Sequence, residues 1–236
     1  MIVYIYLLCY NEEVLLPQTI AHYKKYLPNC KIIIYDNKST DNSVSIAKNN
    51  NCEIITWDSN NLIDDKKYMD IKNNCWKKLD DNTWVIVGDM DEWLCITEEE
   101  LEKEDKNGTT ILNVEGYNII GNSNQVNLVD INLHSINRAI KPWIWESKRM
   151  CFKKGPIIDI NYNGGAHTCN PQGIIKFSSK AYINKHMEYL GIPFIVNKMI
   201  NRNRRVGKDS LGGHYITDVQ KITDNYNNYY KTSVIF

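Results

Sequence analysis

Residues 84–93 read Trp84-Val85-Ile86-Val87-Gly88-Asp89-Met90-Asp91-Glu92-Trp93. The run begins with four apolar residues, as expected for a strand that is buried on both faces. Carboxylates follow where this strand ends, and in a turn two of them can converge on one cation. Asp89 and Asp91 are therefore candidate ligands of Mg²⁺ or Mn²⁺, which bind one or two carboxylates together with phosphate oxygens and water. A solvated acidic turn is the alternative, but the preceding buried strand favours the metal site.

The first hundred residues alternate short apolar runs with amphipathic stretches, which is typical of strands joined by crossover helices. The pattern predicts an α/β fold. Strands are expected at 3–8, 31–35, 53–57 and 84–87, and helices at 14–26, from 41 or 42 to 48, and at 67–79.

Polar loops follow three of these expected strands, at 9–12, 36–41 and 89–92. In open parallel sheets, ligands bind just beyond the carboxyl ends of the strands. We therefore expect the three loops to face one crevice.

Beyond residue 108 the pattern changes to shorter strand-like pieces, at 109–114 and 149–152, and a basic helical stretch is expected from 181 to 205. No linker or internal repeat divides the chain. We expect one domain over 1–236, with a nucleotide-binding half (1–107) and an acceptor-side half with C-terminal helices (108–236).

The chain of 236 residues has a formal net charge of +0 and a pI near 6.9, so no overall field attracts nucleic acid or an acidic membrane. Its 7 cysteines are scattered without a CxxC pair. The apolar start, residues 1–9, is too short for a spanning helix. We expect a cytoplasmic protein without a transmembrane segment, and leave peripheral membrane association open.

Five ordered segments carry a family resemblance. They are Cys9-Tyr10-Asn11-Glu12-Glu13-Val14-Leu15-Leu16-Pro17, Ile34-Tyr35-Asp36-Asn37-Lys38-Ser39-Thr40-Asp41-Asn42-Ser43, Gly88-Asp89-Met90-Asp91-Glu92-Trp93, Gly164-Gly165-Ala166-His167-Thr168-Cys169-Asn170-Pro171-Gln172-Gly173 and Lys185-His186-Met187-Glu188-Tyr189-Leu190-Gly191. Together they resemble family 2-like glycosyltransferases of the GT-A fold, closest to the branch of family 92 and the chlorella-virus capsid glycosyltransferases. The resemblance runs from the first strand to about Tyr215 and implies a Rossmann-like mixed sheet flanked by helices.

The resemblance also implies a nucleotide-sugar site. The loop of Cys9, Tyr10, Asn11 and Glu12 would contact the nucleoside, with Asp36 near the base or ribose. Lys72 and Asn73 resemble a pair that approaches the nucleotide from the helix before the metal motif, although Lys72 could equally be a solvated helix residue.

His167 is a candidate third metal ligand with Asp89 and Asp91. It follows two glycines that would let the backbone approach a ligand, and a neutral imidazole binds Mn²⁺. A hydrogen-bonded role without metal contact is the alternative. Four basic residues could contact the diphosphate, although a charge run is more often a solvated helix face: Arg202, Arg204, Arg205 and Lys208. His214 is a weaker candidate for phosphate contact.

The run Pro142-Trp143-Ile144-Trp145-Glu146 offers aromatic faces on which an acceptor sugar could stack, unless these rings belong to the core. An inverting enzyme needs a general base, and Glu146, Asp159 or Glu92 could serve. A retaining enzyme could use the leaving phosphate instead. Asp91, through the metal, and Glu146 are the expected catalytic residues.

These observations predict a metal-dependent glycosyltransferase that moves a sugar from a nucleotide sugar, most simply a UDP sugar, to a hydroxyl of a glycan or glycoprotein. One alternative is a sugar nucleotidyltransferase, but the loop at 9–13 lacks the glycines and basic residues of a phosphate loop. The other is a catalytically silent glycan-binding protein of the same fold.

Overall fold

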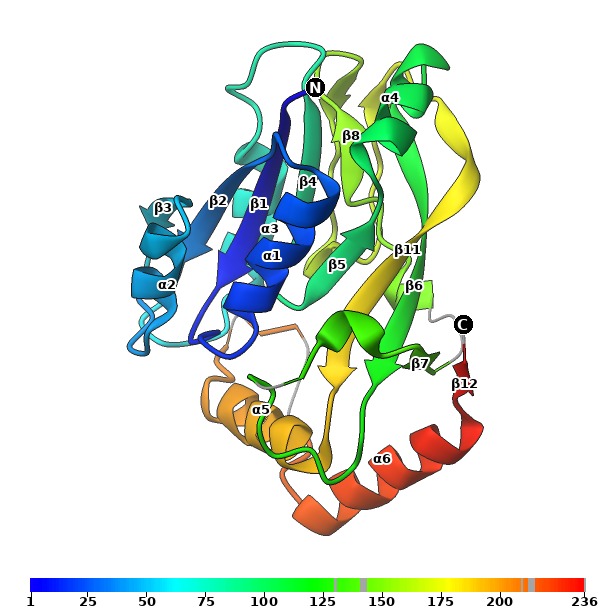
Figure 1. The fold of residues 1–236 in the computed structure, drawn as a ribbon. Helices are drawn as coiled ribbons and strands as arrows, with labels where there is room; N and C mark the ends of the chain where they lie inside the picture. The colour runs from blue at the N-terminus through cyan, green and yellow to red at the C-terminus, as the bar shows by residue number, and fades with distance from the viewer. Residues whose placement is uncertain (130, 141–143, 209, 212–214, 236) are drawn as a thin grey trace.

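The computed structural model describes residues 1–129, 131–140, 144–208, 210–211 and 215–235. Its main element is a 10-stranded sheet in which eight strands follow the order β12-β7-β6-β8-β4-β1-β2-β3, while β11 pairs with β5 and β6 (Figure 1). One continuous sheet therefore includes segments from both ends of the chain.

The first half of the chain forms the parallel part of this sheet. Strand β1 (Val3–Cys9) lies between β2 (Lys31–Asp36) and β4 (Trp84–Asp89), and β3 (Glu53–Thr56) pairs with β2. The register aligns their carboxyl ends, since Cys9 is opposite Asp36 and Leu8 is opposite Asp89. The predicted strands are confirmed, and their carboxyl ends lie at one edge of the sheet.

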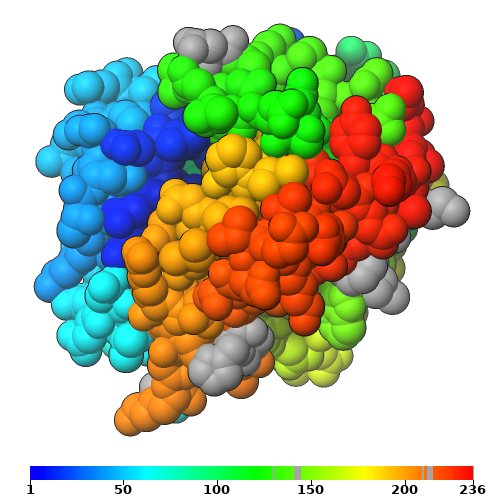
Figure 2. Space-filling view, turned by 90° about the horizontal axis from the view of Figure 1, so that it is seen from below, coloured from blue at the N-terminus to red at the C-terminus, as the bar shows by residue number. Residues whose placement is uncertain are grey.

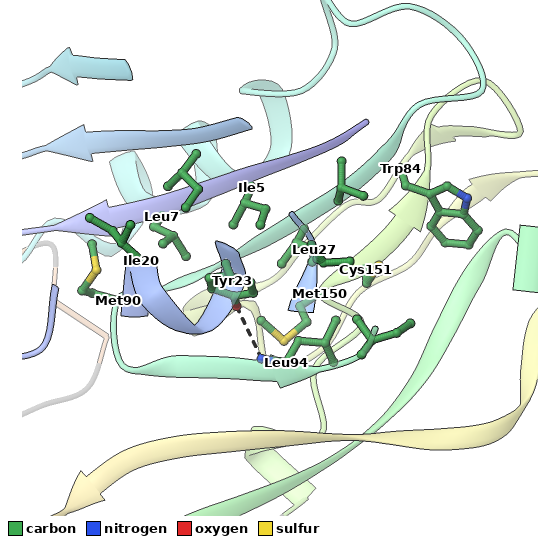
Figure 3. Packing of buried hydrophobic residues seen from close by; sticks show 14 of the residues in the cluster. Ile5, Leu7, Ile20, Tyr23, Leu27, Trp84, Met90, Leu94, Met150 and Cys151 are labelled. Carbon is green, nitrogen blue, oxygen red and sulfur yellow. Dashed lines mark hydrogen bonds between the residues drawn. The ribbon is translucent and has the colours of Figure 1, made fainter. Parts of the chain in front are cut away.

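Side-chain alternation in β1 separates two cores. Ile5 and Leu7 face one side, where Ile20 and Tyr23 of α1 (Leu16–Tyr26) cover them, and Figure 3 shows this cluster with the hydrogen bond from Leu94 N–H to the Tyr23 hydroxyl. Tyr6 faces the opposite side with the segment that follows α3 (Asp65–Asn74). Because both faces of the parallel strands are covered, the central residues of these strands are mainly apolar.

The remaining helices and strands complete the fold. The remaining helices are α2 (Ser43–Asn49), α4 (Glu98–Lys106), α5 (Ile192–Arg204) and α6 (Val219–Thr232). The remaining strands are β5 (Glu92–Cys95), β6 (Ile111–Ile120), β7 (Arg138–Ala139), β8 (Cys151–Lys153), β9 (Ile157–Asp159), β10 (Gln172–Gly173), β11 (Phe177–Tyr189) and β12 (Val234–Ile235). The predicted α/β class, a mixed sheet flanked by helices, is confirmed.

The predicted helix at 181–205 is wrong in its first half, because residues up to Tyr189 belong to β11. Tyr182, Asn184 and His186 alternate as buried positions of this strand, which is the period of a strand, but two of the three are polar. Because these buried side chains are polar, the hydrophobicity pattern did not predict a strand here. The predicted helix at 67–79 also ends early, at Asn74.

Helices α5 and α6 pack against each other through Ile195, Ile222 and Tyr226. Figure 2, which views the molecule from below, shows the two helices side by side on this face. None of the helices in the described residues is long and apolar enough to cross a membrane.

His22, in the middle of α1, is buried at 1% exposure, and its Nε2 lies 2.9 Å from the carbonyl oxygen of Leu94. Burial, with a smaller contribution from nearby His134, lowers the pKa of His22 to about 4. The folded protein therefore holds this imidazole neutral, whereas the unfolded chain binds a proton near pH 6.5.

We predict that His22 makes the protein less stable as the pH falls from 6.5 toward 4, by up to about 1.4 kcal/mol per pH unit. His22→Phe retains an aromatic ring and should flatten this dependence, although it loses the contact with Leu94. Urea denaturation of both proteins between pH 4 and 7 measures the effect. Parallel stability curves for the two proteins would contradict it.

Candidate active site

A cleft of about 610 Å³ lies beyond the carboxyl ends of β1 and β4. Its walls come from segments far apart in the sequence: β1 and its loop, α3, the turn after β4, residues 164–167, β11 and α5. The charged residues that line it are Glu12, Asp65, Lys72, Asp89, Asp91, Glu146, Lys148, His167, His186, Glu188, Arg202 and Arg205. A crevice is therefore present at the strand ends and is rich in ionisable groups. The expected loops at 9–12 and 89–92 line it, but no residue of the expected loop at 36–41 does.

Asp89, the last residue of β4, is held by two lysines. Lys72 Nζ lies 2.8 Å from its carboxylate and Lys148 Nζ lies 3.5 Å away. Burial opposes the ionised carboxylate, but these two cations outweigh it and lower the pKa of Asp89 to about 2. Asp89 is therefore ionised at neutral pH.

Asp91 lies in the tight connection between β4 and β5, where its carbonyl oxygen accepts a hydrogen bond of 2.7 Å from Met187 N–H. Its Oδ2 is 2.6 Å from Lys198 Nζ, 3.4 Å from His186 Nε2 and 3.5 Å from Arg202 Nη2. Burial opposes ionisation here too, yet the cations, Lys198 first among them, hold the pKa of Asp91 well below its usual range.

Lys148 joins several carboxylates beneath the cleft. Its Nζ is 2.5 Å from Glu92 Oε1 and 3.7 Å from Glu146 Oε2, in addition to its contact with Asp89. The Lys148 and Glu92 side chains are 6% and 1% exposed. Burial disfavours the charged lysine, but its three carboxylate neighbours raise its pKa overall.

His186 is a second buried cation with several carboxylate neighbours, and Asp91 is one of them. Its Nδ1 is 2.6 Å from Asn118 Oδ1, 3.4 Å from Glu188 Oε2 and 3.7 Å from Glu146 Oε1. Burial disfavours the charged imidazole, but Asp91 and the two glutamates raise its pKa to about 9. His186 is therefore a cation at neutral pH.

Glu12, in the loop after β1, lines the same cleft. Burial and the charge of Asp91 raise its pKa to about 7, against the opposing effect of Lys198 and Arg202. Backbone N–H of Glu12 donates to the Ser43 hydroxyl at 2.8 Å, which fixes the loop after β1 beside the N-terminus of α2. Glu12 therefore changes charge within the ordinary physiological pH range.

Apolar and aromatic side chains line another part of the cleft, namely Trp57, Ile63, Tyr68, Met69 and Tyr215. Trp57 and Tyr68 meet edge to face, with ring centroids 5.2 Å apart. Nearby, the Arg205 guanidinium lies 3.4 Å from the Tyr10 ring centroid, and its Nε donates to the Asn61 carbonyl at 3.4 Å. Planar groups of a ligand could stack in this part of the cleft.

The structure brings together most of the residues proposed from the sequence. Those that line the cleft are Cys9, Glu12, Lys72, Asp89, Asp91, Glu146 and His167, with Arg202 and Arg205 from the basic run. Arg204 and Lys208 are exposed and are not among the lining residues. Pro142, Trp143 and His214 lie outside the described residues.

Four proposed nucleoside or nucleotide contacts are not among the lining residues: Tyr10, Asn11, Asp36 and Asn73. Asp36 is 2% exposed and accepts from Ser39 N–H at 3.2 Å, so its carboxylate shapes the loop after β2. Asn73 bonds both the N–H (2.7 Å) and the carbonyl (3.2 Å) of Tyr162. Their contact with a nucleotide stays a prediction.

His167 Nδ1 lies 2.6 Å from the Trp145 carbonyl, so Nδ1 is the donor in this contact. No three His, Cys, Asp or Glu side chains of the described residues form a group that could hold a metal ion. The ionised pair Asp89 and Asp91 nevertheless fits Mg²⁺ or Mn²⁺, because such a cation takes its other ligands from phosphate and water. Whether His167 joins them stays a prediction.

Sequence analysis missed three cations of the site, Lys148, His186 and Lys198. Lys148 lies in the sequence just before the apolar run Met150-Cys151-Phe152 of a buried strand, which hints at a buried charge. His186 lies within one of the five segments that carry the family resemblance, but it was not among the predicted site residues. Lys198 had no sequence signal beyond the basic character of its helix.

Residues 4–63 match the model of a family described as glycosyl transferase family 2. The match spans β1 to β3 and the loop that follows. A search of curated proteins gave no match.

Among solved structures, S. aureus TarS is 13% identical over 97% of this chain, with a TM-score of 0.48. This chain spans less than half of that one, 43%. Glucosyl-3-phosphoglycerate synthase of Mycobacterium tuberculosis, solved with Mn²⁺ and UDP, is 12% identical over 49% of this chain and 43% of its own, with a TM-score of 0.33. Likeness at this level carries no conclusion about the substrate of this chain.

We predict that Lys148→Met destabilises the protein by about 3–5 kcal/mol, because it leaves Glu92 as a buried carboxylate without its cation. The double variant Lys148→Met/Glu92→Gln should recover part of this loss, because the glutamine side chain carries no buried charge that needs a cation. Urea denaturation measures both. Lys103→Met, which breaks the exposed pair with Glu99, is the control and should change little. A single variant as stable as the parent would rule out the buried pair.

Proposed function

We propose that this protein is a metal-dependent glycosyltransferase that moves a sugar from a nucleotide diphosphate sugar, a UDP sugar in the simplest case, to a hydroxyl of a glycan or glycoprotein. The family 2 model match over 4–63 supports the class of reaction. The division into a nucleotide-binding half (1–107) and an acceptor-side half (108–236) is part of the proposal, as is a cytoplasmic location.

The observation that carries this proposal is the acidic pair at the end of β4, which faces a cleft of about 610 Å³ together with Lys72, Arg202 and Arg205. A cleft of this size is within the range that holds a small ligand or cofactor. A nucleotide diphosphate needs cations for its phosphates and a flat surface for its base. The cleft offers both, since Trp57 and Tyr68 line it as well.

In this proposal, Asp89 and Asp91 hold Mg²⁺ or Mn²⁺, with His167 as a third ligand through Nε2. The cation, when bound, would neutralise charge on the departing diphosphate. Lys72 and Arg202 would contact phosphate oxygens, and Cys9, Glu12 and Asp36 would shape the nucleoside side.

Glu146 is the proposed base for the acceptor hydroxyl. It lies in the short helical turn Ile144–Glu146, lines the cleft and is 8% exposed. Its Oε2 is buried and accepts no hydrogen bond within the described residues. Trp145 beside it is 52% exposed and could stack on an acceptor sugar. Lys148 Nζ lies 3.7 Å from this oxygen without a hydrogen bond, and a carboxylate at the wall of a cleft is suited to accept a proton.

Incubation with Mn²⁺ and a panel of nucleotide sugars, followed by assay of free nucleotide and of transfer to glycan acceptors, tests the function. Metal-dependent release of nucleotide diphosphate is expected, and EDTA should abolish it. Release of pyrophosphate from a nucleoside triphosphate and a sugar phosphate would instead indicate a nucleotidyltransferase. Glycan binding without donor turnover or metal-dependent nucleotide binding would indicate the silent protein.

We predict that Asp91→Asn weakens Mn²⁺-dependent UDP binding by about 100-fold or more, while His167→Ala weakens it by about tenfold. The carboxylate carries the charge that the cation needs, whereas the imidazole adds one neutral ligand. Calorimetric titration with UDP at fixed Mn²⁺ gives both values. Parent-like affinity in Asp91→Asn would refute the metal assignment, and parent-like affinity in His167→Ala would remove His167 from the ligands.

We predict that Glu146→Gln lowers the rate of sugar transfer by about 100-fold or more without changing UDP affinity, because an amide cannot accept the acceptor's proton. Asp159→Asn, at a carboxylate outside the cleft lining, is the matched control and should leave the rate unchanged. Parent-like transfer by Glu146→Gln would favour a reaction in which the leaving phosphate takes the proton.

A further inference from the structure

Asp91 is 6% exposed in its side chain, so its negative charge needs a counter-ion whenever the cleft holds no ligand. Lys198 on α5 is the closest, with Nζ 2.6 Å from Oδ2. Oδ2 belongs to the carboxylate that the proposed function assigns to a divalent cation. A metal ion at this oxygen and the ammonium of Lys198 would repel each other.

Lys198 differs from the other two cations on Asp91 in how firmly it is held. His186 is also bonded to Asn118 and paired with two glutamates, and Arg202 is also 3.5 Å from Glu188 Oε1. Within the described part of the chain, Asp91 is the carboxylate that Lys198 contacts. Lys198 also has a flexible four-carbon stem and a compact charge, and it can reorient without breaking other ion pairs.

We propose that Lys198 is an exchangeable counter-ion of Asp91. In the donor-free protein it neutralises Asp91. When a divalent cation and a nucleotide diphosphate enter, the cation takes over Asp91 and the Lys198 ammonium moves to a phosphate oxygen. The inference rests on the proposed function, because it requires the metal and the diphosphate to bind in this cleft.

The exchange predicts that removal of the Lys198 charge changes the affinities for Mn²⁺ and for UDP in opposite directions. Removing the Lys198 charge removes a competitor of the metal, so Mn²⁺ without nucleotide should bind more tightly. The same change removes a phosphate contact, so UDP at saturating Mn²⁺ should bind more weakly. A lysine that only supports the fold would weaken both, and a lysine that stays on Asp91 would leave UDP affinity unchanged.

The experiment compares Lys198→Met with Arg204→Met, which removes one positive charge from the same helix at an exposed residue. Neither residue is among those that line the cleft, but Lys198 is 11% exposed and contacts Asp91. Mn²⁺ affinity is measured by electron paramagnetic resonance of free Mn²⁺, and UDP affinity by calorimetry at saturating Mn²⁺. For Lys198→Met we expect Mn²⁺ affinity to rise about fivefold and UDP affinity to fall about tenfold. Arg204→Met should stay within about twofold of the parent on both.

Lys198→Gln, which keeps a polar group beside Asp91, replaces the Met variant if that variant does not fold by circular dichroism. Equal effects of the changes at 198 and 204 on either affinity would overturn the exchange, and so would tighter Mn²⁺ binding with unchanged UDP affinity. If the parent protein binds neither Mn²⁺ nor UDP, the proposed function itself is wrong. If the parent binds both and the Lys198 variants behave like the control, only the exchange is wrong.

Discussion

Buried carboxylates must have cations close by, and this requirement connects the distant segments that form the cleft. Asp89 and Asp91 come from one turn, but their cations come from α3, from the segment before β8, from β11 and from α5. Each pair alone would gain little after its desolvation, so the site depends on the whole set being in place. Stability and the electrostatic properties of the cleft therefore rest on the same side chains.

The sequence was sufficient for the parallel half of the fold. The strands at 3–8, 31–35, 53–57 and 84–87 are mainly apolar runs, and the first three lie side by side in the sheet in sequence order, whereas the fourth returns to pair with the first. Polar loops after buried strands predict the position of the cleft. Lys72 and Glu146 were named from motifs, and both line the cleft. Local sequence patterns are enough to predict helices and strands whose buried faces are apolar.

The rest could not be predicted because it depends on side chains meeting across the chain. In β11 the buried positions carry Asn184 and His186, since these polar groups bond to the Glu146 carbonyl and to Asn118, so hydrophobicity gave no strand signal. Two of the three carboxylates near Lys148 lie 56 and 59 residues earlier, at Glu92 and Asp89. No spacing rule relates such residues, because tertiary packing alone brings them together.

Strand β11 pairs with β5 and with β6 at once, and its register sets His186 opposite both Glu92 and Asn118. Strand pairs between residues far apart in the sequence form slowly, because the entropy of a long loop is lost before the new contacts stabilise it. Asp91 and Lys198 are 107 residues apart. A folding chain would thus acquire its first parallel strands early and its charged cleft late, and ligand binding would report completion of the fold.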